Sequence, residues 1–279
     1  LLTAQNAFFM KKLFTLFSAI ILSCSASAFT VDNINYTVNG TNVTVSSHSL
    51  SESTDLVIPE TVSDGVNEYT VTAIAPYAFN GCSYLTSVVI PNTVTSIGMF
   101  AFQNCANLAS ATISNQVQTI VNATFAETGL TSIVIPESVT SIGDWAFSNC
   151  KQMKRIYLPS SLTYIGEGGF GGNITLEYVE CKNTTPPTLY TGYYNSFIDA
   201  PYTQCDLAVP EESKSLYQNA PIWKDFFQII TGIEAIEANA ESAPVRYYDL
   251  RGIEVSGDEL APGLFIRRCG TSADKVLVK

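Results

Sequence analysis

Basic residues are scarce in this sequence. Its 279 residues include 14 lysines and arginines against 25 aspartates and glutamates, which gives a net charge of −11. No lysine or arginine occurs between Phe29 and Cys150. A groove for a phosphate backbone, or a patch for anionic lipid, needs clustered positive charge. The sequence therefore argues against nucleic-acid binding and against polybasic membrane binding.

Residues that build metal sites and acid/base pairs are also nearly missing. His48 is the single histidine, and no two cysteines have the Cys-x-x-Cys spacing that is typical of zinc sites. We therefore expect no metal and no cofactor. Ser47 and Ser49 flank His48, but adjacent residues of an extended chain point to opposite faces, so we expect a solvated histidine rather than a catalytic pair. The sequence predicts that the protein is not an enzyme.

The N-terminal residues 1–28 predict export. Met10 precedes two lysines, a mostly apolar run over residues 13–22, and small residues that end at Ala28. This run is too short to span a bilayer, and the pattern is that of a signal peptide that follows a short upstream stretch. We expect cleavage before Phe29. The alternative is that Cys24 lies in a lipobox and becomes the lipidated first residue.

A short internal repeat organises the middle of the chain. Phenylalanines recur at a nearly constant spacing, which is shorter by one position in the third unit, and an isoleucine series keeps step with them. The phenylalanines are Phe79, Phe102, Phe125, Phe147 and Phe170. A unit this short cannot bury its own apolar face, so successive units must stack into a coil around one core. The sequence predicts a mainly β solenoid of about five rungs with an internal phenylalanine column.

The repeat unit has a recognisable motif, seen over residues 139–150 as VTSIGDWAFSNC. It resembles the BspA-like leucine-rich repeats of bacterial surface proteins, and the resemblance covers residues 56–181. The third unit departs from the motif, because Thr128 replaces the cysteine and one residue is missing. The fifth unit departs as well, with Gly169 for alanine and Asn173 for cysteine. We expect distortion at those two rungs.

The segments on either side of the repeats predict caps and a separate module. Residues 29–55 predict a hairpin cap, and residues 182–231 a C-terminal cap with a short helix over 211–219. The aromatic anchors expected in the second cap are Trp223, Phe226 and Phe227. Residues 232–244 are rich in Ala and Glu and predict a linker.

Residues 245–279 predict three short strands, over 246–255, 263–268 and 275–279. This module is similar to the C-terminal sorting modules of proteins that the type IX system exports. A small β-module without a role in secretion is the alternative.

The mature chain would contain six cysteines: Cys82, Cys105, Cys150, Cys181, Cys205 and Cys269. The first three share one repeat position, so Cys82 and Cys105 on neighbouring rungs could approach disulfide distance. The competing interpretation, which we favour, is a buried column of free thiols that behave as small apolar groups. Cys269 has no obvious partner.

The outward positions of the repeat strands carry the candidate binding residues. They change from small residues in the first rungs to charged and aromatic ones in the last: Lys154, Arg155, Tyr157, Tyr178 and Glu180. Arginine and tyrosine are enriched at binding hot spots. A solvated sheet face without a ligand is the alternative.

These observations predict an exported, non-enzymatic recognition protein that binds an extracellular protein or glycan, at the cell surface, in the outer membrane or outside the cell. The family resemblance implies adhesion to surface components. A passive coat protein without a specific ligand is the second hypothesis, and a hydrolase the third.

Overall fold

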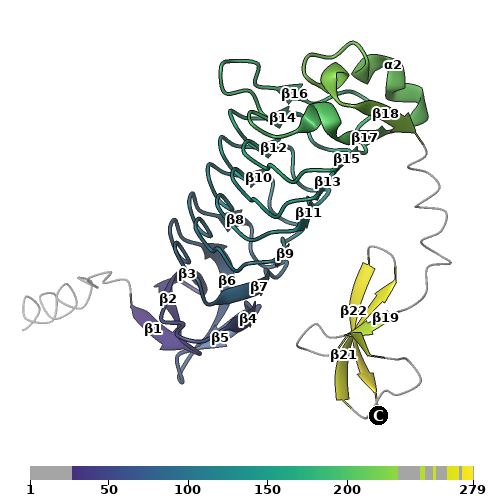
Figure 1. Ribbon diagram of the computed structural model, residues 1–279. Coiled ribbons are helices and arrows are strands. Elements are labelled where there is room, and N and C mark those ends of the chain that lie inside the picture. The colour runs from purple at the N-terminus through teal and green to yellow at the C-terminus, as the bar shows by residue number, and fades with distance from the viewer. Residues whose placement is uncertain (1–26, 232–245, 249–253, 256–262, 270–271, 279) are drawn as a thin grey trace, which may run out of the picture.

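The structure is a computed structural model, which describes residues 27–231, 246–248, 254–255, 263–269 and 272–278. The predictions for residues 1–26 and for the linker lie outside these residues. Within residues 27–231 the chain winds into an elongated coil of stacked rungs (Figure 1). Two ladders of short parallel strands run along the coil and enclose its core between them.

The first ladder contains one strand of each rung, which is the longer one in every rung after the first. Its strands pair in parallel as β4-β7-β9 and as β11-β13-β15-β17-β18. Their bounds are β4 Thr54–Val57, β7 Leu85–Val89, β9 Ser110–Thr112, β11 Ser132–Val134, β13 Arg155–Leu158, β15 Tyr178–Cys181, β17 Asp206–Val209 and β18 Gln228–Thr231. Inward residues such as Val88, Ile133 and Ile156 are buried, and the residues between them face outward.

The second ladder contains the isoleucines of the Ile-Gly motif. Its pairs are β6-β8 and β10-β12-β14-β16, all parallel. Their bounds are β6 Glu68–Ile74, β8 Ser96–Ile97, β10 Thr119–Ile120, β12 Ser141–Ile142, β14 Tyr164–Ile165 and β16 Thr188–Leu189. The isoleucines of these strands are buried, which explains why they keep the repeat spacing.

The N-terminal sheet closes one end of the coil. It contains β1 (Ala28–Val31), β2 (Ile34–Asn39), β3 (Asn42–His48) and β5 (Thr61–Ser63) in the order β1-β2-β3-β6-β5. Strand β2 pairs antiparallel with β3 through a turn that contains Gly40, and β3 then pairs in parallel with β6. The edge of the first rung is thereby hydrogen-bonded, as an open solenoid end requires.

The other end of the coil contains the helical turns. These are η1 (Tyr202–Gln204), η2 (Glu211–Ser213), α2 (Lys214–Tyr217) and η3 (Trp223–Asp225). Trp223 and Phe226 are buried and pack edge to face on Phe197, with centroid distances of 5.8 and 5.4 Å. Phe227 is 66% exposed, so its prediction as a third anchor was wrong.

The C-terminal module has four described strands where the sequence suggested three. They are β19 (Arg246–Tyr248), β20 (Glu254–Val255), β21 (Gly263–Cys269) and β22 (Ser272–Val278), antiparallel in the order β20-β19-β21-β22. The predicted strand over 246–255 is divided into β19 and β20, which pair with each other.

The predicted phenylalanine column is confirmed, and it is longer than predicted. Successive rings stack nearly parallel with centroids 5.1 to 5.6 Å apart, and every ring is fully buried. The column contains Phe79, Phe102, Phe125, Phe147, Phe170 and Phe197. The sixth ring was missed because an insertion separates Phe197 from Phe170 by more than one repeat length.

His48 extends the phenylalanine column at its N-terminal end, so the prediction of a solvated histidine was wrong. Its imidazole stacks on Phe79 with a centroid distance of 5.5 Å and an interplanar angle of 8°. The backbone N–H of Leu50 donates to Nδ1 at 3.2 Å, and the Cys82 Sγ lies 3.8 Å from the same nitrogen. Nδ1 is therefore an acceptor, and burial lowers the pKa of His48.

This arrangement predicts a pH dependence of stability. Because the folded-state pKa of His48 is lowered, its contribution is complete above the unfolded pKa of about 6.5 and is lost as the pH falls below it. We expect the melting temperature of the wild type to fall relative to that of the His48→Phe variant between about pH 7 and pH 5. Parallel melting curves of the two proteins across this range would contradict the account.

The cysteine position of the repeat supplies a hydrogen-bond donor to the phenylalanine column. Cys105 Sγ donates to the carbonyl oxygen of Phe79 at 3.1 Å, and Cys150 Sγ to that of Phe125 at 3.2 Å. Both thiols are free, as are those of Cys82, Cys181 and Cys205, and all five are buried. Burial raises the pKa of Cys105 to about 12 and that of Cys150 to about 11, so these thiols are poor nucleophiles.

The two rungs without this cysteine are not distorted, because other donors take its place. Thr128 Oγ1 donates at 3.0 Å to the carbonyl of the phenylalanine in its own rung. Asn173 Nδ2 donates to the carbonyls of Phe147 and Phe170 at 3.1 and 3.0 Å, and its Oδ1 accepts the Cys150 N–H at 2.8 Å. The expected distortion was therefore wrong, since ring stacking continues through both rungs at 5.1 to 5.6 Å.

Candidate functional site

Strands β13 and β15 place four of the five predicted binding residues opposite one another on adjacent strands. Arg155 pairs with Tyr178, and Tyr157 pairs with Glu180, across a parallel ladder. Lys154 immediately precedes β13. Residues at matching positions of parallel strands lie on the same face of the sheet, so the predicted residues form one surface. We call Lys154, Arg155, Tyr157 and Tyr178 the strand-face cluster.

Contacts within the strand-face cluster hold its side chains against one another. The Arg155 guanidinium lies 5.5 Å from the centroid of the Tyr178 ring, a cation–π contact. The rings of Tyr157 and Tyr178 lie 6.1 Å apart with an interplanar angle of 56°. Lys154 Nζ lies 3.4 Å from Glu177 Oε1, and because both side chains are about 60% exposed this pair contributes little to stability.

Glu180 is buried, which corrects the expectation that it faces solvent. Only 4% of its surface is exposed, and its Oε2 accepts a hydrogen bond from the Tyr178 hydroxyl at 3.3 Å. Burial, followed by the negative charge of Glu180, raises the pKa of Tyr178, so its hydroxyl stays protonated and can donate this bond. Glu180 thus positions Tyr178 and does not itself lie on the accessible surface.

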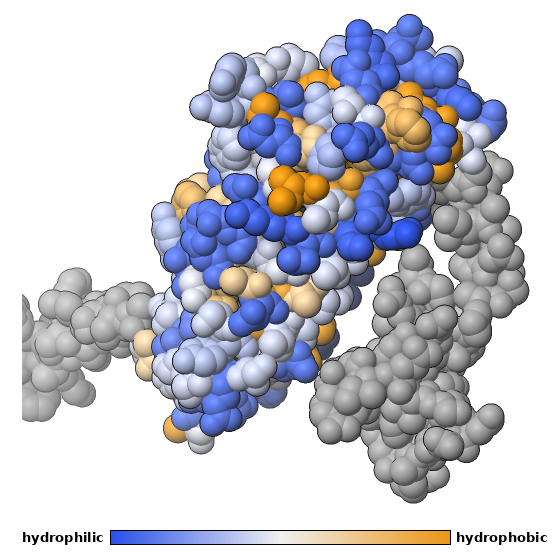
Figure 2. Space-filling view, in the orientation of Figure 1, coloured by the Kyte–Doolittle hydropathy of each residue, from blue (hydrophilic) through white to orange (hydrophobic). Residues whose placement is uncertain are grey.

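The outward positions of the first rungs lack comparable groups. On β7 and β9 they are Ser87, Val89, Ser110 and Thr112, all small. Figure 2 shows one face of the molecule, on which apolar side chains gather mainly in the upper part of the coil, among strongly hydrophilic ones. The side chains best suited to a specific interface lie in the later rungs.

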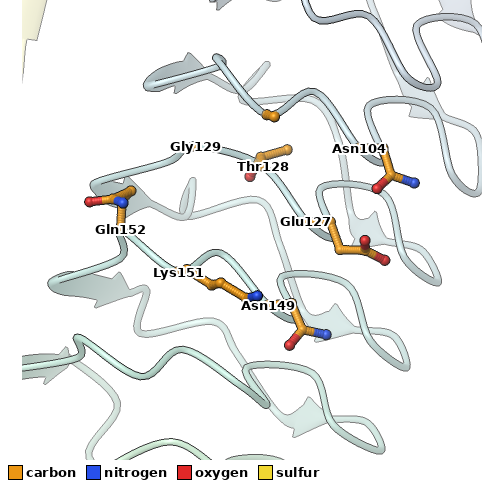
Figure 3. A pocket seen from close by; sticks show the side chains of 8 residues that line it. Asn104, Glu127, Thr128, Gly129, Asn149, Lys151 and Gln152 are labelled. Atoms are coloured by element: carbon orange, nitrogen blue, oxygen red, sulfur yellow. The ribbon is translucent and has the colours of Figure 1, made fainter.

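A depression of about 570 Å³ lies at the turns of the second to fourth rungs. It is lined by Asn104, Ala106, Glu127, Thr128, Gly129, Asn149, Lys151 and Gln152. Figure 3 shows Asn104, Glu127 and Asn149 one above another along one side. The third rung, which lines the middle of the depression, is one residue short: Leu130 follows its phenylalanine by five residues, whereas Leu108 and Met153 follow theirs by six. The sequence pattern did not predict this depression.

The depression adjoins the strand-face cluster through residues 151–155. Lys151 and Gln152 line the depression, and Lys154 and Arg155 follow in the same chain segment. Three cationic residues thus fall within five consecutive positions of a chain of net charge −11. The two surfaces together offer amide, carboxylate and cationic groups next to two aromatic rings.

The described residues contain no cluster suited to metal binding. No group of three or more histidine, cysteine or carboxylate side chains within them could hold a metal ion. His48 stacks in the column, and the buried cysteines have raised pKa values.

The fold and surface define the class: a parallel-β repeat solenoid with an aromatic core. Residues 72–197 match the family model described as BspA type leucine rich repeat region, in six copies. The match covers somewhat less than half of the 279 residues, and the family model finds one more copy than the five rungs expected.

Several solved structures are similar to this chain. The leucine rich repeat protein of T. pallidum is 28% identical, covers 55% of this chain and 71% of its own, and has a TM-score of 0.49. The pneumococcal vaccine antigen PcpA is 22% identical over 68% of this chain and 51% of its own, with a TM-score of 0.53, and shows the shared fold. A leucine-rich repeat protein from Bacteroides ovatus is 26% identical over 65% of this chain and 49% of its own, with a TM-score of 0.45. This chain thus spans about half the length of each of these last two proteins. No curated protein matches it.

Proposed function

We propose that this protein is a non-enzymatic recognition protein that binds an extracellular protein or glycan through the strand-face cluster. The observation that carries the proposal is the fixed geometry of Arg155, Tyr157 and Tyr178 on adjacent strands. BspA-type repeat proteins are generally binding proteins found at cell surfaces, which supports an adhesin-like role. Pre-positioned tyrosine and arginine side chains lose little conformational entropy on binding.

Binding by full-length protein to an array of glycans and matrix proteins tests this proposal. We expect the double variant Tyr157→Ala, Tyr178→Ala to lower affinity for the captured partner at least tenfold, or about 1.4 kcal/mol. The matched control is Ser110→Ala, Thr112→Ala, which alters equivalent outward positions on β9 and should leave the affinity unchanged. Full affinity in the tyrosine variant would remove this site assignment. A wild type that binds nothing on the array would favour the passive coat protein.

Export to the cell surface or the medium is part of the same proposal. Its support is the leader pattern up to Ala28 and the cell-surface location usual for the family. Among the described residues, no helix has the length and apolar character needed to cross a membrane. N-terminal sequencing of the mature protein should find Phe29, whereas a lipid-modified Cys24 would replace this view with an anchored lipoprotein. A sorting role for the C-terminal module would follow if its deletion retained the protein inside the cell.

A further inference from the structure

A second surface lies at the turns that precede the phenylalanine column. At these turns, a repeated backbone hydrogen bond joins each rung to the next. The donor is the N–H of the residue two positions before the phenylalanine of one rung. The acceptor is the carbonyl of the residue three positions before the phenylalanine of the next rung. The Ala123, Trp145 and Gly168 N–H groups donate in this way to Asp144, Glu167 and Tyr194, at 2.9, 2.8 and 3.0 Å. Successive rungs therefore place a polar column in line: Asn122, Asp144 and Glu167, followed by Tyr194.

An insertion adds aromatic residues to the end of this polar column. Phe197 follows Leu189 by eight residues, whereas Phe170 follows Ile165 by five. The three extra residues enlarge the loop after β16 (Figure 1). Within this loop Tyr193 is 84% exposed and Tyr194 is 47% exposed. Tyr194 takes the repeat position of Asp144 and Glu167, where the other rungs have no aromatic residue, so the repeat does not account for the exposed ring.

The exposed tyrosines are held in a defined arrangement with Trp145. The rings of Tyr193 and Tyr194 meet edge to face at 4.7 Å, and Trp145 meets Tyr194 edge to face at 5.5 Å. The indole of Trp145 lies over Gly168, where a Cβ atom would be 2.3 Å from the ring. Glycine at this position is therefore required by the indole, and the three rings form an aromatic platform that is partly open to solvent.

The carboxylate beside this platform is also held in place. Asp144 Oδ1 accepts the Glu167 N–H at 2.9 Å, and Asp144 Oδ2 accepts a hydrogen bond from Asn122 Nδ2 at 3.4 Å. The Asp144 and Glu167 side chains are half-buried. Each carboxylate oxygen can accept more than one hydrogen bond, so Asp144 and Glu167 retain acceptor capacity toward solvent.

We propose that Trp145, Tyr193 and Tyr194, together with Asp144 and Glu167, bind a neutral glycan. Aromatic ring faces pack against the C–H faces of pyranose rings, and carboxylates accept hydrogen bonds from sugar hydroxyls. The two carboxylates repel uronic acids and sulfated sugars, so the platform selects uncharged sugars. This site is separate from the strand-face cluster and stands or falls independently of it.

Tryptophan fluorescence of the full chain provides a local readout. The sequence has two tryptophans, and Trp223 is only 1% exposed, so a ligand-induced change in emission reports on Trp145. The probes are cellohexaose, mannohexaose and chitohexaose as neutral oligosaccharides, and oligogalacturonate as the acidic one. We expect at least one neutral probe to change the emission and to bind by calorimetry at millimolar or lower concentration, while oligogalacturonate does neither.

The double variant Tyr193→Ala, Tyr194→Ala should weaken that binding at least tenfold, because it removes two of the three rings of the platform. Both side chains lie on an exposed loop, so their loss leaves the core intact. Tyr84→Ala, at an exposed tyrosine elsewhere on the coil, is the matched control and should bind normally. The Tyr157→Ala, Tyr178→Ala variant should also bind normally, which separates this site from the strand-face cluster. The proposal is overturned if no neutral probe binds at about 5 mM, if oligogalacturonate binds equally well, or if the Tyr193/Tyr194 variant retains full affinity.

Discussion

Phe125→Ala is expected to lower the free energy of unfolding by about 3–5 kcal/mol. Phe125 is fully buried, and its two ring faces contact Phe102 and Phe147 at centroid distances of 5.1 and 5.4 Å. Removing the ring leaves a cavity at the middle of a stack that cannot close without moving whole rungs. Because each rung is stabilised mainly by its neighbours, a central gap weakens coupling between the two halves of the coil.

Urea denaturation followed by circular dichroism measures the effect of Phe125→Ala. The control is Phe227→Ala, which removes the same ring from a side chain that is 66% exposed and should change stability by less than about 0.5 kcal/mol. If Phe125→Ala and Phe227→Ala were equally stable, the column would not be the main stabilising element.

Asn173→Leu is expected to destabilise the protein by about 3 kcal/mol or more. The asparagine amide group satisfies three buried backbone groups, the carbonyls of Phe147 and Phe170 and the N–H of Cys150. Leucine has a similar volume but no polar atom, so it leaves these groups without partners at about 1–3 kcal/mol each.

Asn173→Cys provides the matched comparison for this position. It restores the residue found at equivalent positions in other rungs, where Cys105 and Cys150 donate from Sγ to a phenylalanine carbonyl. We expect the cysteine variant to lose clearly less stability than the leucine variant in the same denaturation experiment. Equal losses would show that volume, and not hydrogen bonding, governs this position.

The coil and its phenylalanine column could be predicted from the sequence because both depend on spacing. Phe79 and Phe102 fall one repeat length apart, and a short unit with one apolar face has no way to bury it other than stacking. Local departures were harder to interpret. Asn173 looked like a defect in the motif, but the hydrogen bonds that its amide makes to neighbouring rungs become visible only when the rungs are stacked.

The outward surface could be predicted in part. Successive side chains of a strand point to opposite faces of the sheet, so the sequence of β13 and β15 predicted that Arg155, Tyr157 and Tyr178 share one face. The same alternation placed Glu180 there, yet its burial depends on how the neighbouring segments pack, which strand periodicity does not contain. His48 was misassigned for a related reason, since it lies in the N-terminal sheet and its stacking partner Phe79 lies in the first rung, distant in the sequence.

Hydrogen–deuterium exchange of the complex with the captured partner tests the central claim most directly, because it locates the contact surface without a mutation. The account predicts slower exchange in peptides that contain β13 and β15, and unchanged exchange in peptides that contain β7 and β9. Protection confined to β7 and β9, or absent from the strand-face cluster while the partner stays bound, would contradict it.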